Sequence, residues 1–232
     1  VTGGKTMDSF RNMIIDVVKR HGPNGVGIHR SKSMVVLPGF FRPTKQWDLL
    51  IVHGERLLAA LELKSLCGPS FSNNANNRCE EAIGSAYDFR QAQSEGLFGS
   101  GAAPFLGYFI FVEDADKSRI AVGSRSPHFP ADSCFQNASY QRRMLLMCEK
   151  MVQQQLYSCA SVLTAPKSSR SGDHTNLSAH TSFRQLLTRL ASHLSNEAEA
   201  DHFSDLLNEP QATYNVASLS EDNYFEPDDD SL

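Results

Sequence analysis

The sequence predicts an α/β domain in which a mixed β-sheet is flanked by α-helices. Three observations support this class: apolar residues at helical spacing near the start, two apolar runs around a glycine-containing turn, and an aromatic, β-branched run near the middle. Their order, helix, hairpin, helix, strand and helix, is typical of a sheet between helices. We expect a single domain over residues 1–206 and an acidic, irregular tail over residues 207–232.

The first element is an amphipathic helix over residues 7–21. Its apolar residues recur at helical spacing: Met7, Phe10, Ile14, Val17 and Val18. The run His-Gly-Pro-Asn-Gly that follows is a strong stop signal. A short strand is expected over residues 33–37, where Pro38 and Gly39 end it.

The next element is a β-hairpin. Residues 47–52 and 57–64 are apolar runs of strand length on either side of a turn that contains Gly54. Because neither run alternates with polar residues, we expect both strands to be buried on both faces. The second run is rich in Leu and Ala and is compatible with a helix on propensity alone, but the turn favours a strand.

A polar loop at residues 68–78 precedes a predicted helix over residues 80–93. Four residues are spaced along this helix: Ile83, Ala86, Tyr87 and Arg90. After a break at Gly99-Ser100-Gly101, residues 106–112 (LGYFIFV) form the strongest strand signal in the chain, and we expect a central strand there.

The last third is predicted to be mostly helical. Residues 140–162 carry apolar side chains in a helical pattern and give the longest predicted helix. A polar loop over residues 167–178 separates it from a helix over residues 181–203. From about residue 208 the chain has little to pack and is expected to be irregular.

Composition excludes several classes of protein. The chain is 41% hydrophobic and 21% charged, and its apolar runs are too short to span a bilayer, so no membrane partner is expected. Five widely spaced cysteines without a CxxC pair fit reduced thiols better than disulfides or zinc. Since no secretory signal is visible at Val1, we expect a cytoplasmic protein.

Charge is divided unequally along the chain, although the net charge is −4. Residues 1–189 hold all 22 Lys and Arg but only 15 of the 26 acidic residues, which gives this part a net charge of +7. The remaining 11 acidic residues follow Arg189. A basic body suits a partner that carries phosphates, whereas the alternative is a solvated acidic end without a role.

Three charged residues interrupt the apolar hairpin: Asp48, Glu62 and Lys64. Glu62 and Lys64 lie two positions apart and therefore project from the same face of their strand, and the hairpin brings Asp48 across from them. Two carboxylates and an ammonium compensate one another if a divalent cation joins them. The alternative is a charged pair at the end of a surface strand.

The spacing Asp-x13-Glu-x-Lys resembles the PD-(D/E)xK nucleases, with Trp47 where a proline often stands. The resemblance implies a Mg²⁺ site held by Asp48, Glu62 and the carbonyl of Leu63. It also implies that Lys64 orients the attacking water or helps to deprotonate it.

Three segments carry a closer resemblance, to the XhoI family of type II restriction endonucleases: residues 3–10, 47–65 and 76–91. This similarity extends over about residues 1–206 and implies a restriction-endonuclease-like core. It further implies a homodimer that cuts both strands of a palindromic DNA duplex, CTCGAG in the best-known case, and leaves 5′-phosphate ends with a short 5′ overhang. The system would be bacterial and would include a cognate DNA methyltransferase that forms no stable complex with the nuclease.

Further candidates have simpler explanations. Asp8 is a possible outer carboxylate of the metal site, or a partner of the helix dipole in a first turn. Glu80 and Glu81 open the predicted second helix and are more often caps than ligands. Gln91 is similar to a glutamine that some related nucleases bring to the cleaved phosphate, or it lies on a solvated helix face.

The residues expected to contact DNA lie in two places. Arg142, Arg143 and Lys150 are on the long predicted helix and are candidates for phosphate contacts. The loop over residues 167–178 carries side chains able to pair with base edges in the major groove: Arg170, Asp173, His174, Thr175 and Asn176. For any single residue of either set, a plain solvated surface is the more common explanation.

Other functions remain open at this point. Gly4-Lys5-Thr6 before a helix is similar to the end of an ATP-binding P-loop, but the loop requires a glycine five residues before Gly4, at a position ahead of Val1. A protein with the nuclease fold that processes other DNA, or that only binds it, is a further alternative. A serine or cysteine hydrolase is disfavoured because no nucleophile elbow is present.

Overall fold

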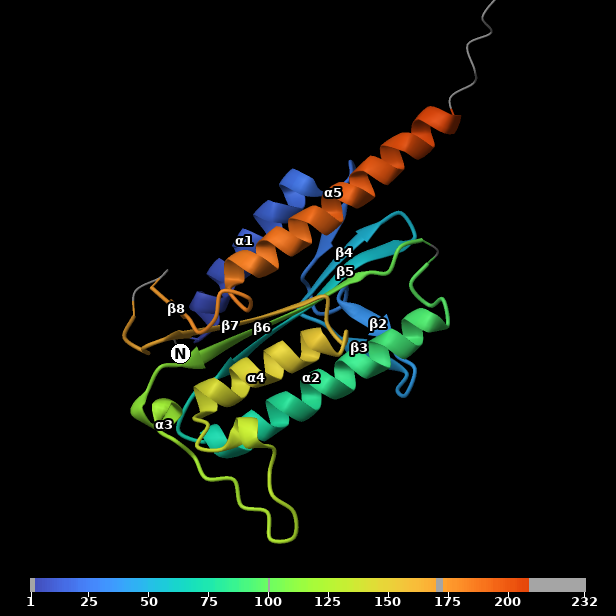
Figure 1. Cartoon of the computed structure of the whole chain (residues 1–232). Coiled ribbons are helices and arrows are strands. Elements are labelled where there is room, and N and C mark those ends of the chain that lie inside the picture. Colours follow the sequence, from blue (N-terminus) through green and yellow to red (C-terminus); the bar gives the residue numbers. More distant parts are fainter. Residues whose placement is uncertain (1–2, 100, 170–172, 209–232) are drawn as a thin grey trace, which may run out of the picture.

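The computed structural model describes residues 3–99, 101–169 and 173–208. At its centre lies a six-stranded sheet in the order β1-β4-β5-β6-β7-β8 (Figure 1). The strands are β1 (Gly27–His29), β4 (Leu49–His53), β5 (Arg56–Leu66), β6 (Phe105–Glu113), β7 (Cys159–Ala165) and β8 (Thr175–Asn176). A separate two-stranded ribbon pairs β2 (Val36–Pro38) with β3 (Thr44–Gln46).

The sheet is mixed, as predicted. β4 and β5 form the antiparallel hairpin expected from the sequence, with Leu49 opposite Leu61. β6 pairs in parallel with both β5 and β7, and β8 adds an antiparallel edge. β6 contains the predicted central strand, and its residues are buried over most of their length.

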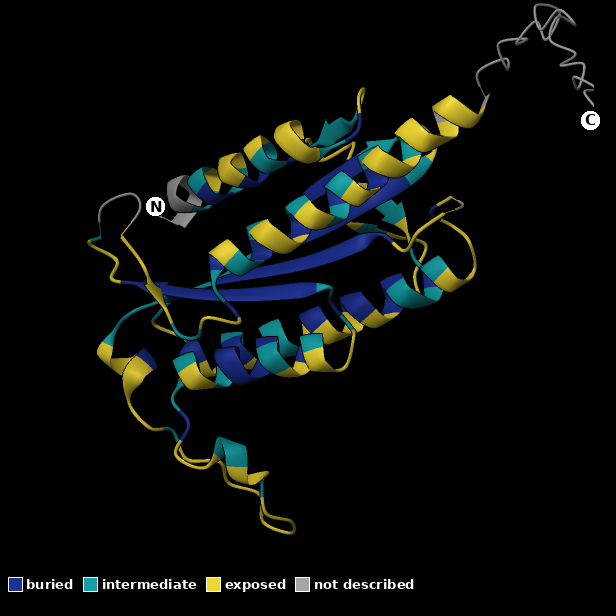
Figure 2. Ribbon diagram, turned by 45° about the horizontal axis from the view of Figure 1, so that its top comes forward, coloured by how far each residue is buried: buried dark blue, intermediate teal, exposed yellow. Residues whose placement is uncertain are grey.

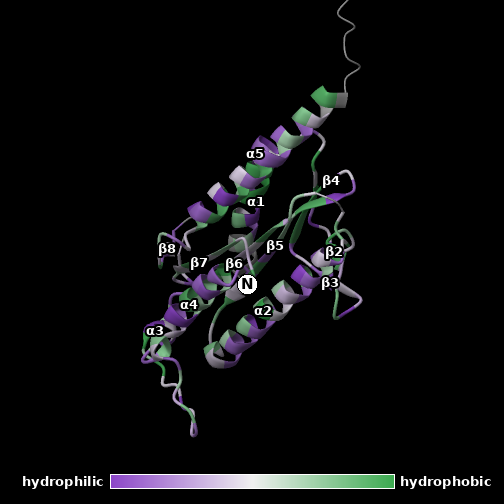
Figure 3. Cartoon of the chain, turned by 45° about the vertical axis from the view of Figure 1, so that its right-hand side comes forward, coloured by the Kyte–Doolittle hydropathy of each residue, from purple (hydrophilic) through white to green (hydrophobic). Residues whose placement is uncertain are grey.

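Helices cover both faces of the sheet (Figures 1 and 2). α1 (Gly3–His21) and α5 (Phe183–Asn208) pack on one face, while α2 (Phe71–Ser94) and α4 (Tyr140–Gln153) pack on the other. Short turns of helix, α3 (Asp116–Arg119) and η1 (Ser133–Phe135), lie in the connection between β6 and α4. The central strands β4, β5, β6 and β7 are largely apolar, whereas β3 and β8 consist of polar residues and the helices mix hydrophilic and hydrophobic residues (Figure 3).

Successive side chains of β5 point to opposite faces of the sheet, and this alternation decides which helices each of them contacts. Leu61 and Leu63 belong to the core beneath α1 and α5, whereas Ala60 and Leu66 belong to the core beneath α2 and α4. Glu62 and Lys64 share the parity of Ala60 and Leu66, so they point toward α2. The two charged residues therefore replace apolar side chains on the α2 face of a central strand.

The prediction of one helix over residues 140–162 is wrong. α4 ends at Gln153, Gln155 adopts a φ of 58°, and the chain then enters β7. All seven residues of β7 are buried because helices cover both faces of this strand. A strand without polar alternation cannot be distinguished by periodicity from a continuing buried helix. The longest helix among the described elements is α5, not the helix that begins at Tyr140.

The predicted polar loop at residues 68–78 is also largely wrong, because α2 begins at Phe71. Phe71 and Ala75 are buried one turn apart, while the polar residues between them face outward. Ile83 and Tyr87, expected along the helix, are 43% and 51% exposed. Of the short strands, the predicted one at residues 33–37 corresponds to β2, whereas β1 and β3 were not predicted.

The first and last helices of the described chain correspond to two further predicted elements. α1 contains the predicted helix at residues 7–21, and α5 contains the one predicted at residues 181–203 except for its first two residues. The two helices pack side by side. The predicted irregular tail falls almost entirely on residues 209–232, which lie outside the described part. Within that part, no helix combines the length and hydrophobicity needed to cross a membrane.

Candidate active site

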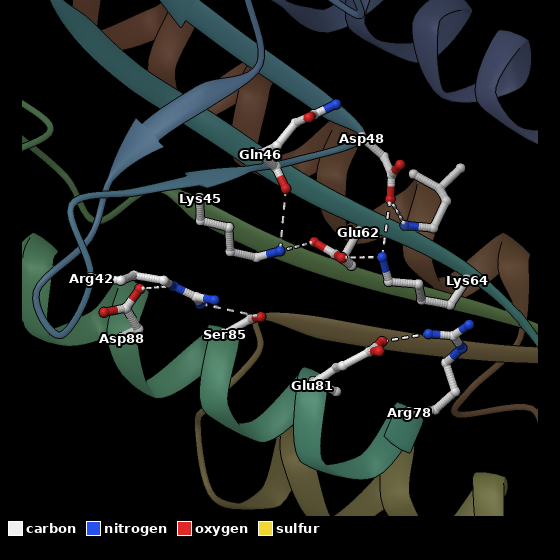
Figure 4. Close-up of polar contacts among 12 residues, drawn as sticks. Arg42, Lys45, Gln46, Asp48, Glu62, Lys64, Arg78, Glu81, Ser85 and Asp88 are labelled. Carbon is white, nitrogen blue, oxygen red and sulfur yellow. Dashed lines mark hydrogen bonds and ion pairs between the residues drawn. The ribbon is translucent and has the colours of Figure 1, made fainter. Parts of the chain in front are cut away.

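The β4–β5 hairpin brings Asp48, Glu62 and Lys64 together on the face of the sheet that looks toward α2 (Figure 4). The amide of Leu63 donates to Asp48 Oδ2 at 2.8 Å, and this bond fixes the Asp48 carboxylate beside β5. Lys64 Nζ lies 4.0 Å from Asp48 Oδ2 and forms an ion pair with Glu62 Oε1. One hairpin therefore supplies two carboxylates and an ammonium at a single point.

A second ammonium completes the cluster. Lys45 on β3 places Nζ 2.9 Å from Glu62 Oε2, so each oxygen of Glu62 faces a lysine. Lys45 also lies over the ring of Trp47, 4.5 Å from the ring centroid. The sequence analysis missed this residue because β3 has only three residues and no apolar pattern, and its only signal is the short distance from Asp48 along the chain.

Burial sets the electrostatics of this cluster. The side chain of Glu62 is 5% exposed and that of Lys45 is 12% exposed, whereas Asp48 and Lys64 reach solvent. Burial raises the pKa of Asp48, and the neighbouring Glu62 carboxylate raises it further, against the lowering effect of the Leu63 amide and of Lys64. Two carboxylates are thus held close together where water is partly excluded, which costs free energy unless positive charge lies between them.

The donor set fits a hard divalent cation such as Mg²⁺, which prefers oxygen ligands and usually keeps several waters beside one or two carboxylates. Within residues 3–99, 101–169 and 173–208, no group of three or more His, Cys, Asp and Glu is arranged to hold a metal. Asp48 and Glu62 provide two carboxylates, and a role for them as metal ligands stays a prediction. Leu63 contacts Asp48 through its amide, and a role for its carbonyl stays a prediction.

Opposite the hairpin, α2 forms the second wall of an open cleft of about 600 Å³. We call this space the hairpin–α2 cleft. Four basic side chains line it, and they stand beside the carboxylates: Arg42, Lys45, Lys64 and Arg78. Phe41 and Tyr87 contribute an apolar part of the lining. Four carboxylates line it as well, those of Glu62, Glu80, Glu81 and Asp88, and each of the four cations forms an ion pair with one of them. Phosphates of a polyanion that reached Glu62 would therefore compete with these carboxylates for the cations.

The other carboxylates named from the sequence lie in different settings from those expected. Asp8 is in the second turn of α1 rather than the first, and it is exposed and paired with Arg11 at 2.7 Å. Glu80 and Glu81 do not open α2, because the helix begins nine residues before Glu80. Both line the hairpin–α2 cleft, where Glu81 forms an ion pair with Arg78.

Gln91, late in α2, is half-buried and lies outside the lining of the cleft. Arg142 on α4 is exposed, whereas Arg143 donates to the carbonyls of Val122, at 2.9 Å, and Ala138, at 3.3 Å. The guanidinium of Arg143 thus holds the loop that precedes α4. Lys150 lies 3.7 Å from Asp132.

The loop expected to read bases is described only in part, since Arg170 falls outside the described residues. Asp173 is exposed, and its carbonyl accepts a hydrogen bond from Ser169 at 3.2 Å. The ring of His174 lies 6.1 Å from that of Phe10 on α1. Asn176, in β8, is exposed at the sheet edge and pairs with Leu163 of β7. None of these described residues lines the hairpin–α2 cleft.

The chain is similar to known proteins over most of its length. Residues 1–176 match the family of restriction endonuclease XhoI. A type II restriction enzyme XhoI from Xanthomonas vasicola is 47% identical over 153 residues, which cover 66% of this chain and 62% of the relative. AbrI from Azospirillum brasilense is 50% identical over 54% of this chain and 56% of its own length.

BstVI from Geobacillus stearothermophilus, also a type II restriction enzyme, is 44% identical over 72% of this chain and 76% of its own. The chain thus spans about three-fifths of the first two relatives and about three-quarters of the third. No solved structure is significantly similar to it.

Proposed function

This chain belongs to the XhoI family of restriction endonucleases, and from that premise we propose that it is a type II site-specific deoxyribonuclease. In this proposal it hydrolyses both strands of duplex DNA with Mg²⁺, as part of a bacterial restriction–modification system. The observation that carries the proposal is the meeting of Asp48, Glu62 and Lys64 in the hairpin–α2 cleft. The relatives support it, since each is named as a type II restriction enzyme.

Each residue of the cluster has a distinct task in this proposal. Asp48 and Glu62, with the Leu63 carbonyl, would hold the cation, which when bound would supply Lewis-acid stabilisation of the charge that develops on the phosphate. Lys64 orients the attacking water or, as the neutral amine after losing its own proton, accepts the proton of that water. The water oxygen bonds to phosphorus while the bond from phosphorus to the 3′ oxygen breaks, so the products carry a 5′-phosphate and a 3′-hydroxyl.

The chemistry is tested with a plasmid that bears one CTCGAG site and a control plasmid without it, each with Mg²⁺ and with EDTA. We expect the first plasmid alone to be linearised, and only with Mg²⁺. Cleavage at other sequences would support the nuclease activity and would reject CTCGAG as the recognition sequence. Binding of duplex DNA without nicking under any divalent metal would contradict the nuclease proposal in favour of a binding module.

The residue assignments are tested by Asp48→Ala, Glu62→Gln and Lys64→Ala. We expect each change to reduce cleavage by about 10²- to 10⁴-fold, the contribution typical of a positioned acid–base or ligand group. Lys19→Ala serves as the matched control, because Lys19 is exposed in the last turn of α1 and is not part of the cleft lining. Unchanged rates in all three site variants would place the chemistry elsewhere.

Two partners complete the proposal. Symmetric cleavage of a palindrome is most simply performed by a two-fold dimer, so we propose a homodimer, which sedimentation at several concentrations tests directly. A cell that carries this activity needs its own sites protected, and a cognate methyltransferase encoded nearby would supply that protection. Arg142, Asp173, His174 and Asn176 remain proposed DNA contacts, and Arg143 remains one despite its bonds to backbone carbonyls.

A further inference from the structure

The loop that joins β2 to β3 presents two phenylalanines to solvent. Phe40 is 46% exposed and Phe41 is 66% exposed, and their rings meet edge to face with centroids 4.8 Å apart. Tyr87 of α2, itself half exposed, stacks on Phe41 with centroids 5.7 Å apart and 15° between the planes. Three neighbouring aromatic rings in contact with water form an apolar patch of the kind that marks binding surfaces.

The loop is firmly held in this position. Asp88 of α2, whose side chain is 6% exposed, accepts hydrogen bonds from the amides of Phe40 at 2.9 Å and Phe41 at 2.7 Å, and from Arg42 Nε at 2.8 Å. Gly39 permits this close approach, since a Cβ there would lie 2.7 Å from the Arg42 carbonyl. A buried carboxylate thus fixes the backbone of two residues whose side chains remain outside the core.

The patch is continuous with the proposed active site. Phe41 and Tyr87 line the same hairpin–α2 cleft as Glu62 and Lys64. The cleft therefore holds flat apolar rings beside cations that, in the unbound chain, are paired with its own carboxylates. Cations match the phosphates of DNA, and rings match the faces of its bases. A second copy of this chain seated on the rings would instead cover one wall of the cleft that the DNA must enter.

We propose that Phe41, supported by Phe40 and Tyr87, packs against a base step of bound DNA next to the cleaved phosphate and partly unstacks it. This inference rests on the proposed function. A phenylalanine side chain has no donor or acceptor with which to read base edges, so its contribution to site choice comes from how easily the step deforms. Asp88 is a positioning residue in this arrangement, because it touches the loop backbone and not the DNA.

The experiment uses the full chain in a Lys64→Ala background with Mg²⁺, so that bound DNA stays intact. Two duplexes carry CTCGAG with 2-aminopurine, either in place of the adenine of the site or at the flanking base pair, because this base fluoresces more strongly when it is unstacked. The variants compared are Phe41→Ala, Phe41→Trp and the control Phe129→Ala. Phe129 is 78% exposed on the loop between α3 and η1 and is not among the residues that line the cleft.

We expect duplex binding to raise fluorescence at one of the two positions in the parent and in Phe129→Ala. Phe41→Ala should abolish the rise and weaken binding about 5- to 100-fold, the range seen when a stacking side chain is truncated. Phe41→Trp, which keeps a ring at this position, should retain the signal. Thermal unfolding of Phe41→Ala and Phe129→Ala is measured alongside, to confirm that both variants are folded.

Three results would overturn the inference. If Phe41→Ala keeps both the signal and the affinity while the chain with Lys64 intact cleaves DNA, the aromatic contact is refuted and the nuclease proposal stands. If Phe41→Ala keeps the signal but sediments as a smaller species, the patch is an interface between copies. If the chain with Lys64 intact does not cleave duplex DNA, and neither it nor any variant binds duplex DNA, the proposed function fails and the inference fails with it.

Discussion

Glu62 is an almost fully buried carboxylate in a central strand, and two lysines offset the cost of placing a charge there. Lys64 and Lys45 each face one of its oxygens, and the Lys45 ammonium is itself 12% exposed. Because water is excluded, removing one partner leaves charge that solvent cannot compensate. A divalent cation held by Asp48 and Glu62 would take over part of this compensation, which couples metal binding to stability.

That coupling can be measured with Lys45→Met, which keeps the bulk of the side chain and removes its charge. In EDTA we expect the free energy of unfolding to fall by about 3 kcal/mol, the lower end of the range for breaking a buried ion pair, since Lys64 still faces Glu62. Mg²⁺ should restore more stability to the variant than to the parent. Urea unfolding with and without Mg²⁺ gives both numbers, and the prediction fails if Mg²⁺ stabilises the two proteins equally.

Tyr108 and Tyr157 form a matched pair of buried phenols, with ring centroids 5.3 Å apart. Burial raises the pKa of both hydroxyls well above the usual value. Tyr157 donates to the carbonyl of Ala82 at 3.0 Å, whereas the Tyr108 hydroxyl has no hydrogen-bond partner among the described residues. We therefore expect the two hydroxyls to have opposite effects on stability.

We expect Tyr108→Phe to raise the free energy of unfolding by about 1 kcal/mol, because it removes an unsatisfied buried polar group, and Tyr157→Phe to lower it by about 1 kcal/mol. Chemical denaturation of both variants under one set of conditions measures the difference. Destabilisation by Tyr108→Phe equal to that of Tyr157→Phe would show that the Tyr108 hydroxyl has a partner, such as an ordered water.

At the scale of elements, the loop over residues 39–43 is tied to α2 through Asp88. Burial by itself would raise the pKa of Asp88, but the amides of Phe41 and Phe40 and the guanidinium of Arg42 outweigh it and hold the pKa below its ordinary value. A carboxylate with a lowered folded pKa stabilises the protein fully above its unfolded pKa of about 3.9, and this contribution is lost as the pH falls through the folded pKa.

Asp88→Asn should therefore lower the free energy of unfolding by about 1.5–3 kcal/mol at pH 7, the loss expected for bonds to a charged acceptor. The gap between parent and variant should stay constant down to about pH 5 and narrow as the pH falls below the unfolded pKa of about 3.9. It should close only below the lowered folded pKa of Asp88, where the parent also loses the charge. Urea unfolding across this pH range measures it. Asp16→Asn, an exposed change on α1, is the control and should stay within about 0.5 kcal/mol of the parent.

The elements that the sequence predicted correctly are those with a local signal. The β4–β5 hairpin has a glycine turn between two apolar runs, and α1 has apolar residues at helical spacing. The prediction was wrong at β7 because a strand covered on both faces carries no alternation of polar and apolar residues. β3 has three residues without a pattern, so Lys45, its contribution to the site, could not be found before the β2–β3 ribbon was seen.

At the scale of the whole molecule, the site arises because a layer of helices packs on each face of one sheet. The motif residues come from the hairpin alone, and spacing in the sequence was enough to bring them together. The opposite wall comes from α2, and nothing local in the chain indicates which helix stands across from Glu62 or that Tyr87 faces the cleft. That information lies in the crossover from β5 through α2 to β6, which is a property of the complete fold.

Charge is also a property of the whole chain. Residues 209–232 contain seven acidic residues and no Lys or Arg, and they follow a body with a net charge of +7 over residues 1–189. Acidic residues on the same chain compete with phosphates for the cations of the body, and this competition weakens as salt screens it. We expect them to suppress non-specific binding to DNA most strongly at low ionic strength.

The prediction is tested in the full chain by replacing these seven carboxylates with amides, which changes the net charge from −4 to +3. The affinity for a duplex without the CTCGAG site should rise by about tenfold at 50 mM salt, and the gain should shrink toward none at 300 mM because the Debye length falls below about 6 Å. Fluorescence anisotropy over this salt range measures it. An affinity equal to that of the parent at 50 mM would show that the acidic residues do not reach the DNA-binding surface, whereas a gain independent of salt would require a contact other than charge.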